Sequence, residues 1–159
     1  MSDKLNVIVL GALGFVGRNL IKSLVEKNIC SHIRAVDKCM FITAYMHDEH
    51  KQAYEHEIVK YVQADLARDS HVDRAFAGEV SFDVVINCCG ETRYGLPEQE
   101  YKNRSLNVAI ACGKKANELK IKKFIEISHG GIYHSNSKQS DEDSKIDPWT
   151  IQAQYRYAA

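Results

Sequence analysis

The sequence Gly11-Ala12-Leu13-Gly14-Phe15-Val16-Gly17 follows the apolar run Val7-Ile8-Val9-Leu10 and begins a stretch with helical periodicity. The apolar run is short and β-branched, which is typical of a strand buried in a parallel sheet. Glycines after such a strand let the chain turn sharply and let its backbone approach a pyrophosphate closely. The amides and the positive dipole end of the following helix would face that anion. This stretch predicts a dinucleotide phosphate site, with a purely structural glycine turn as the alternative.

The bulk composition favours one domain of a cytoplasmic protein. The chain has 159 residues, and a domain of this size buries roughly two thirds of its unfolded surface. Lys+Arg and Asp+Glu are both 21, and this balance argues against a nucleic-acid or membrane partner. No apolar run approaches the ~20 residues of a bilayer span. Five cysteines without regular spacing indicate reduced thiols. His47 and His50 lack an evident third ligand, so no metal site is expected.

Short apolar runs alternate with helix-like stretches along the chain, and this alternation predicts parallel strands joined by right-handed crossovers. The expected fold is a Rossmann-type doubly wound α/β domain with sheet order 3-2-1-4-5 and helices on both faces. The expected strands are 7–10, 33–36, 58–63, 82–87 and 123–128. The expected helices are 15–27, 40–56, 70–78, 97–119 and one that begins at Pro148, with a loop over 135–147.

Local patterns within these helices give finer expectations. In the first helix, the apolar face should consist of Val16, Leu20, Leu24 and Val25. Ser70 with Asp73 three residues later is a variant of the capping box, so this helix should begin at Ser70. Proline is favoured in a first helical turn, which places the start of the last helix at Pro148.

Residues at the ends of the next strands indicate which nucleotide would bind. Asp37 lies about 20 residues beyond the last loop glycine, where a carboxylate accepts hydrogen bonds from a ribose diol and repels a 2′-phosphate. This favours NAD over NADP, although the neighbouring Lys38 weakens the preference. Asp65-Leu66 follows the third strand, where a carboxylate could meet the adenine amino group. The small residues Cys88-Cys89-Gly90 follow the fourth strand and would let the backbone pass close to the cofactor.

Together these pieces resemble the extended (atypical) short-chain dehydrogenase/reductase family, which includes NAD-dependent epimerases and dehydratases. The glycine spacing G-x-x-G-x-x-G is more typical of this family than of ordinary dehydrogenases. The resemblance implies that residues 1–159 form an NAD(P)-binding domain without the C-terminal part and substrate domain of the family. It also implies a small-molecule substrate and a homodimer, since relatives often pair through their fourth and fifth helices. Further matching pieces are Asn87-Cys-Cys-Gly90, Phe124-Ile-Glu-Ile-Ser128, Ile132-Tyr133 and Asp141-Glu142 before Pro148.

The resemblance also locates four catalytic positions by spacing. In the family a tyrosine is the acid/base, a lysine four residues later lowers its pKa, a serine or threonine orients the substrate and an asparagine supports a water relay. A tyrosine with no cation nearby has a pKa of about 10 and is a poor base at neutral pH. A slipped register would use Tyr155 or Tyr157, and neither gives a complete Tyr–Lys pair. In the order tyrosine, lysine, serine or threonine, and asparagine, the four positions hold Gln152, Arg156, His129 and Ser105.

Three functions remain open on this sequence. The first is an NAD-binding protein with a degenerate catalytic centre that acts as a structural or regulatory subunit. The second is an active NAD-dependent epimerase/dehydratase or reductase on a nucleotide sugar, with an unusual acid/base such as His129, which could titrate near neutral pH. The third is an interaction module that no longer uses a nucleotide.

Overall fold

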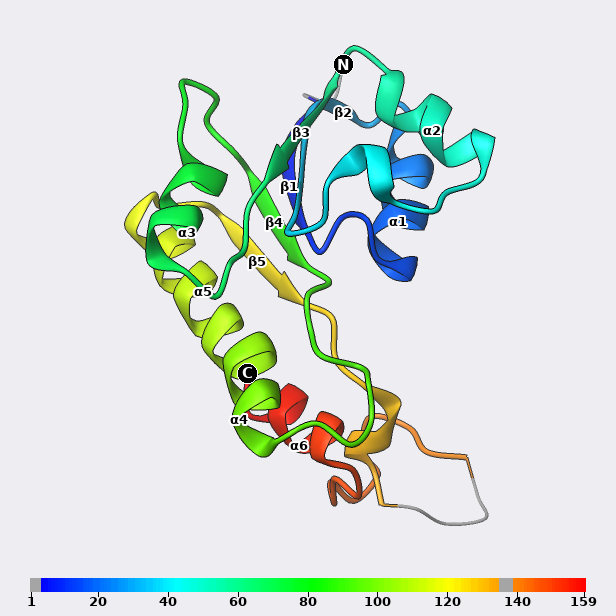
Figure 1. The fold of residues 1–159 in the computed structure, drawn as a ribbon, viewed down its shortest axis with the longest axis vertical. Coiled ribbons are helices and arrows are strands. Elements are labelled where there is room, and N and C mark those ends of the chain that lie inside the picture. The colour runs from blue at the N-terminus through cyan, green and yellow to red at the C-terminus, as the bar shows by residue number, and fades with distance from the viewer. Residues whose placement is uncertain (1–3, 135–138) are drawn as a thin grey trace.

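The computed structural model describes residues 4–134 and 139–159 and contains one parallel five-stranded sheet with the order β3-β2-β1-β4-β5 (Figure 1). This confirms the Rossmann-type fold and its strand order. The strands are β1 (Leu5–Leu10), β2 (Cys30–Asp37), β3 (Val59–Gln63), β4 (Val84–Asn87) and β5 (Lys123–Glu126). The α-helices are α1 (Phe15–Glu26), α2 (Asp48–Glu55), α3 (Asp69–Phe76), α4 (Glu98–Tyr101), α5 (Val108–Glu118) and α6 (Ile151–Tyr157). Short 3₁₀ turns occupy Phe41–Thr43 and Gly130–Ile132, and a π-helical segment, Lys102–Asn107, joins α4 to α5.

Helices cover both faces of the sheet, with α1 and α2 on one side and α3 and α5 on the other (Figure 1). The central strand β1 shows why two layers are needed, since its side chains alternate between the faces. Val7 and Val9 belong to the core beneath α1 and α2, whereas Ile8 and Leu10 belong to the core beneath α3 and α5. All four side chains are buried, so β1 lies at the centre of the domain and fixes the position of the loop that follows it.

The register of the sheet brings three loops together at its carboxyl edge. Leu10 at the end of β1 is paired with Val36 of β2 and with Asn87 of β4. The segments after β1, β2 and β4 therefore leave the sheet side by side, at the edge where open parallel sheets bind their ligands.

Two predicted helix starts are wrong. The expected helix 40–56 is a 3₁₀ turn followed, after a gap, by the shorter helix α2. Because this stretch has no clean amphipathic period, tertiary contacts decide its structure. The last helix begins at Ile151 rather than at Pro148. Thr150 is its N-cap, and its hydroxyl accepts a hydrogen bond from the Ala153 amide at 3.1 Å.

Two finer expectations for the helices can be compared with the structure. The expected apolar face of α1 is confirmed at Leu24, which is buried, and at Leu20 and Val25, which pack against the same core, but Val16 is exposed and the face also includes Gly17 and Ile21. Helix α3 begins at Asp69 and has no side-chain cap, so Ser70 and Asp73 form no capping box. The Asp73 carboxylate lies 2.6 Å from the Lys115 ammonium of α5 instead, and this ion pair joins two helices on the same face.

The predicted loop 135–147 is only partly described, since residues 135–138 lie outside the described residues. The described part forms one antiparallel bridge between Tyr133 and Ile146, which joins the two ends of this segment. Within the ranges 4–134 and 139–159, no helix combines the length and the apolar character that crossing a bilayer requires.

Candidate dinucleotide site

The glycine loop turns tightly out of β1 because its first residue has a positive φ. Gly11 has φ +72°, and a Cβ on this residue would lie 2.9 Å from the Cys89 amide nitrogen after β4. Gly17 lies where α1 crosses the loop, and a Cβ there would lie 2.3 Å from the Gly11 carbonyl oxygen. A side chain at either position would therefore collide with backbone, so both glycines are needed for the close approach of helix and strand.

The first turn of α1 faces the space above this loop with its backbone amides. Gly14 is the N-cap, and its carbonyl accepts the first intrahelical hydrogen bond from the Arg18 amide at 3.0 Å. The amides of Phe15, Val16 and Gly17 precede that bond and have no carbonyl one turn earlier in the helix. The Phe15 side chain is 75% exposed, so this residue can serve an anion only through its backbone.

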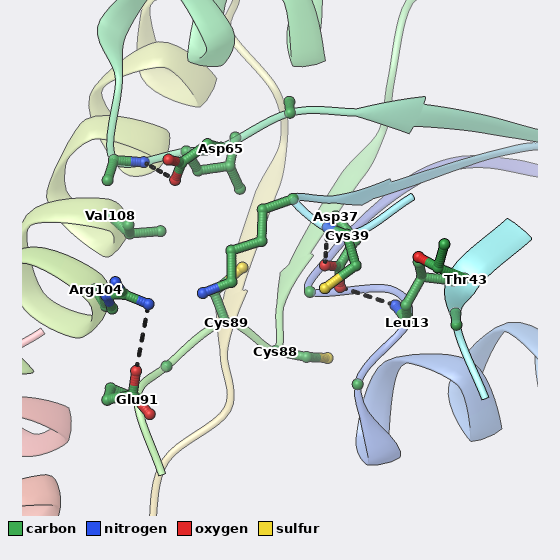
Figure 2. A pocket seen from close by; sticks show the side chains of 18 of the residues that line it. Leu13, Asp37, Cys39, Thr43, Asp65, Cys88, Cys89, Glu91, Arg104 and Val108 are labelled. Atoms are coloured by element: carbon green, nitrogen blue, oxygen red, sulfur yellow. Dashed lines mark hydrogen bonds and ion pairs between the residues drawn. The ribbon is translucent and has the colours of Figure 1, made fainter. Parts of the chain in front are cut away.

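Asp37 connects the end of β2 to the glycine loop. Its Oδ2 accepts a hydrogen bond from the Leu13 amide at 3.0 Å, and its Oδ1 accepts one from the Cys39 amide at 3.0 Å (Figure 2). Each carboxylate oxygen can accept a further hydrogen bond. Asp37 can therefore hold the loop and still accept from a ribose hydroxyl.

A cavity of about 510 Å³ opens at the carboxyl edge of the sheet, where these segments meet (Figure 2). It brings together most of the residues expected to bind the cofactor, although binding by them stays a prediction. The side chains of Phe15 and Val16 are exposed, Gly17 is buried under the loop, and these three residues do not line the cavity. The expected residues that do line it are Gly11, Leu13, Gly14, Asp37, Lys38, Asp65, Leu66, Cys88, Cys89 and Gly90.

The sequence interpretation missed one side of this cavity. Arg104, in the π-helical segment, lines it and lies 3.6 Å from the Glu91 carboxylate (Figure 2). Glu91 is buried and also pairs with Arg93 at 2.7 Å, and the hydrogen bonds from Arg93 lower the pKa of this carboxyl to about 2. No sequence motif marks Glu91 or Arg104 as cavity residues, because the loop after β4 brings Glu91 there and the π-helical segment brings Arg104. Other lining residues that were not expected are Cys39, Thr43, Ala44, Tyr45, Ala64, Ala67 and Val108.

None of the four expected catalytic residues lines the cavity. Ser105 is buried, and its hydroxyl accepts a hydrogen bond from the Glu91 amide at 3.1 Å. Gln152 is buried, and its Nε2 donates to the Arg93 carbonyl at 3.1 Å. The Nδ1 of His129 accepts from the Gly131 amide at 2.8 Å, which makes Nε2 the protonated nitrogen of the neutral ring. Three of the four side chains therefore make hydrogen bonds to backbone groups.

Arg156, at the remaining expected position, takes part in a polar chain at the end of β5. Its Nη1 lies 2.7 Å from Glu126 Oε1, and Asn87 Nδ2 donates to Glu126 Oε2 at 2.6 Å. Burial raises the pKa of the Glu126 carboxyl, although both partners act in the opposite direction. The Arg156 guanidinium also lies against Gly90, where an added Cβ would be 2.4 Å from Nη2. The cation that the resemblance assigns to the family's lysine position is therefore paired with a carboxylate.

One known protein family matches most of this chain. Residues 7–159 match the family model described as NAD dependent epimerase/dehydratase family. The chain belongs to the NAD-dependent epimerase/dehydratase family. NAD is the cofactor of this family, as predicted, and the recognition of the family from the sequence is confirmed.

Relatives and solved structures cover almost the whole chain. A human dTDP-D-glucose 4,6-dehydratase is 27% identical over 163 residues, which is 96% of this chain and 44% of that protein. The chain therefore spans less than half the length of this relative. A UDP-glucuronic acid 4-epimerase from Bacillus cereus in complex with NAD has a TM-score of 0.75 at 20% identity, covering 97% of this chain and 49% of that one. DesIV, a dTDP-glucose 4,6-dehydratase from Streptomyces venezuelae with NAD and TYD bound, has a TM-score of 0.80 at 15% identity, with the same coverage.

The two tyrosines that a slipped register would use, Tyr155 and Tyr157, lie in the last helix, α6. The Tyr155 hydroxyl donates to Glu98 Oε1 at 2.7 Å, and this hydrogen bond raises the pKa of the phenol. A catalytic phenol needs the opposite shift, which a neighbouring cation provides. Tyr157 is 55% exposed at the end of α6.

The adjacent cysteines Cys88 and Cys89 pack against the two hydrophobic cores. Burial raises the pKa of the Cys88 thiol to about 11 and raises the pKa of the Cys89 thiol well above its ordinary value. Such thiols remain protonated at neutral pH and are poor metal ligands and nucleophiles. Over 4–134 and 139–159, no group of three or more His, Cys, Asp or Glu side chains could hold a metal ion.

Proposed function

We propose that this chain binds NAD at the Gly11–Gly17 loop and acts as a structural or regulatory NAD-binding protein without the family's usual acid–base chemistry. The observation that carries this proposal is the 2.7 Å ion pair between Arg156 and Glu126, next to Gln152 at the tyrosine position. Binding and catalysis are separable in this fold, because the phosphate site and the acid–base pair come from different elements.

The preference for NAD rests on Asp37. Its carboxylate lies in the cavity at the end of β2 and is fixed by two backbone amides. A carboxylate held there favours a ribose diol and repels a 2′-phosphate. Lys38 also lines the cavity and offsets part of that repulsion. NAD should therefore bind more tightly than NADP.

The proposed loss of the usual chemistry rests on Gln152 and Arg156. A side-chain amide cannot act as a general acid or base at neutral pH, and the Gln152 amide already donates to the Arg93 carbonyl. Arg156 keeps a positive charge, but Glu126 lies 2.7 Å away and balances it, and the two side chains are only 11% and 21% exposed. Without a phenol and a free cation beside it, the general acid and base of the family are both missing.

One observation favours an active enzyme as the second candidate. His129 follows the end of β5 at the family's serine position, and its Nε2 is not the nitrogen bonded to Gly131. The curated relatives include dTDP-D-glucose 4,6-dehydratase, so a nucleotide sugar is the substrate class of this alternative. The chain would then use the imidazole as its acid or base.

A turnover assay separates the two candidates. The chain is incubated with NAD and either dTDP-glucose or UDP-glucuronate, and products and NADH are followed. We expect no turnover above the uncatalysed rate, although the chain binds NAD. Turnover that disappears in the variant His129→Ala would overturn the proposal and establish the second candidate.

Two further expectations concern partners and location. Homodimer formation is a proposal that light scattering on the purified chain can test, with one or two chains per particle as the outcomes. A cytoplasmic location is likewise proposed from the reduced cysteines and is tested by fractionating cells that express the native protein.

A further inference from the structure

The lining of the cavity does not include every position expected to contact a dinucleotide. Its lining runs from Asp65 and Val108 past the glycine loop to Gly90 and Glu91. The residues at the family's four catalytic positions are absent from that lining. These positions surround the reacting ring in the family that the chain resembles. The lining therefore includes the positions expected to contact the ADP part of a dinucleotide and omits those expected at its reacting ring.

Side chains fill the space beyond Gly90. The Arg156 guanidinium lies against Gly90 so closely that an added Cβ would meet three of its atoms at 2.4–2.6 Å. Its charge is matched by Glu126, which in turn accepts from Asn87. Arg156 and Glu126 side chains are only 11% and 21% exposed, so this polar chain is a packed part of the domain.

The helix that carries Arg156 is fixed in this position. Gln152, one turn earlier, donates to the Arg93 carbonyl, and Tyr155 donates to Glu98 at 2.7 Å. Both partners belong to the segment after β4, which closes over the same end of the sheet. Moving Arg156 aside would break its ion pair and disturb these contacts, so a ligand gains little by displacing it.

The open part of the cavity offers partners for an anion and a ribose. The free amides at the start of α1 face a diphosphate, and Asp37 accepts from the adenosine ribose. Lys38 and Arg104 are the two cationic side chains in its lining. The amides and Asp37 would contact the ADP portion of a ligand.

Because the lining offers partners for ADP and Arg156 fills the space beside Gly90, we infer that the cavity recognises the ADP moiety alone. The nicotinamide riboside of NAD would then have no specific contacts. This inference rests on the proposed NAD binding and names the part of the ligand that is recognised. ADP-ribose, which has the same ADP group and a second ribose but no nicotinamide, should then bind as tightly as NAD. The chain would respond to ADP-containing nucleotides in general.

Calorimetric titrations of the chain with NAD, ADP-ribose and nicotinamide mononucleotide test this inference. We expect dissociation constants for NAD and ADP-ribose that agree within about fivefold, and no saturable binding of nicotinamide mononucleotide. A preference for NAD over ADP-ribose of more than about fivefold would overturn the inference and leave NAD binding intact. If neither NAD nor ADP-ribose binds, the proposed function itself fails.

A fluorescence measurement checks the same point without relying on affinity. NADH is bound to the chain, and its nicotinamide emission is compared with that of free NADH before and after displacement by ADP-ribose. A ring that remains in solvent keeps the emission maximum of the free cofactor, which is the expected result. A blue shift that ADP-ribose reverses would show an enclosed ring and contradict the inference.

Asp37→Ala serves as the matched variant for both experiments. Because Asp37 faces the part that NAD and ADP-ribose share, this substitution should weaken both ligands by the same factor. A loss for NAD alone would mean that the two ligands use different contacts and would also contradict the inference.

Discussion

The Asp37 carboxylate holds the backbone of the glycine loop, because its Oδ2 accepts a hydrogen bond from the Leu13 amide at 3.0 Å. The residue expected to bind a ribose therefore also orders the loop expected to bind phosphates. Sequence spacing predicted the first role and gave no indication of the second. Binding of NAD and stability of the loop are consequently coupled through one side chain.

Replacing Asp37 should affect both properties. Asp37→Ala removes the acceptors for Leu13 and Cys39, and we expect the free energy of unfolding to fall by about 1–2 kcal/mol. We also expect the dissociation constant for NAD to rise by about tenfold or more. Urea unfolding and NAD titration measure the two effects. Asp37→Asn is the control, since it keeps one acceptor oxygen without the charge; an Asp37→Ala protein with unchanged NAD affinity would remove Asp37 from the site.

The buried glycine of the loop allows a test of helix–strand packing. In Gly17→Ala the new Cβ would lie 2.3 Å from the Gly11 carbonyl oxygen and 2.8 Å from the Ala12 Cα. Both neighbours are backbone and cannot move freely, so we expect a loss of about 2 kcal/mol or more of folding stability. Thermal unfolding followed by circular dichroism measures this loss.

Gly113→Ala is the matched control for that variant. Gly113 lies in α5, and nothing is within 4 Å of an added Cβ. Alanine is the better helix former, so this variant should gain about 0.5–1 kcal/mol. Equal effects of the two substitutions would contradict the close packing at Gly17.

Glu91 should make the stability of the domain depend on pH in the acid range. Its folded pKa is about 2, below the ordinary value of 4.5, because Arg93 donates to its carboxylate. The native state therefore favours the ionised form, and the stabilisation is present above pH 4.5 and is lost as the pH falls toward 2. Because the Arg93 side chain is 61% exposed, solvent screening reduces the contribution to about 1–2 kcal/mol.

Urea unfolding between pH 2 and pH 6 of the wild type and of Glu91→Gln measures this contribution. The variant should be less stable at pH 6 and should converge on the wild type as the pH falls. A constant difference across this range would show that Glu91 does not titrate as proposed.

The cysteines should differ in their reactivity toward alkylating reagents. Cys39 is exposed and lines the cavity, whereas Cys30 and Cys112 are buried in the two cores. Burial raises the pKa of Cys112 to about 12, so it remains a protonated thiol. With iodoacetamide at pH 8, mass spectrometry should find Cys39 labelled first, and NAD should slow that reaction. Early labelling of Cys112 would contradict its placement in the core.

The fold and the phosphate loop were predictable because both depend on local patterns. The β-branched run before Gly11 and the glycine spacing constrain the chain within a few residues. Asp37 was predictable as well, since the length of a β-α-β unit fixes its distance from the loop. These signals require no knowledge of distant contacts.

Other parts of the site depend on partners far away in the sequence. Arg104 reaches the cavity through a π-helical segment, which the continuous helical pattern of 97–119 does not reveal. Glu126 appears in the sequence as one residue of a strand, and only the fold brings it to Arg156, thirty positions later. The stretch 40–56, where one helix was expected, has no regular apolar period. Instead, the ring of Phe41 in the 3₁₀ turn packs against the ring of Tyr54 in α2.

The decisive measurement is a calorimetric titration of the chain with NAD, repeated with NADP under the same conditions. We expect saturable binding of one NAD per chain and an affinity for NADP that is at least about tenfold lower, because the Asp37 carboxylate repels a 2′-phosphate. An absence of heat with millimolar NAD, or equal affinity for NADP, would contradict the dinucleotide site described above.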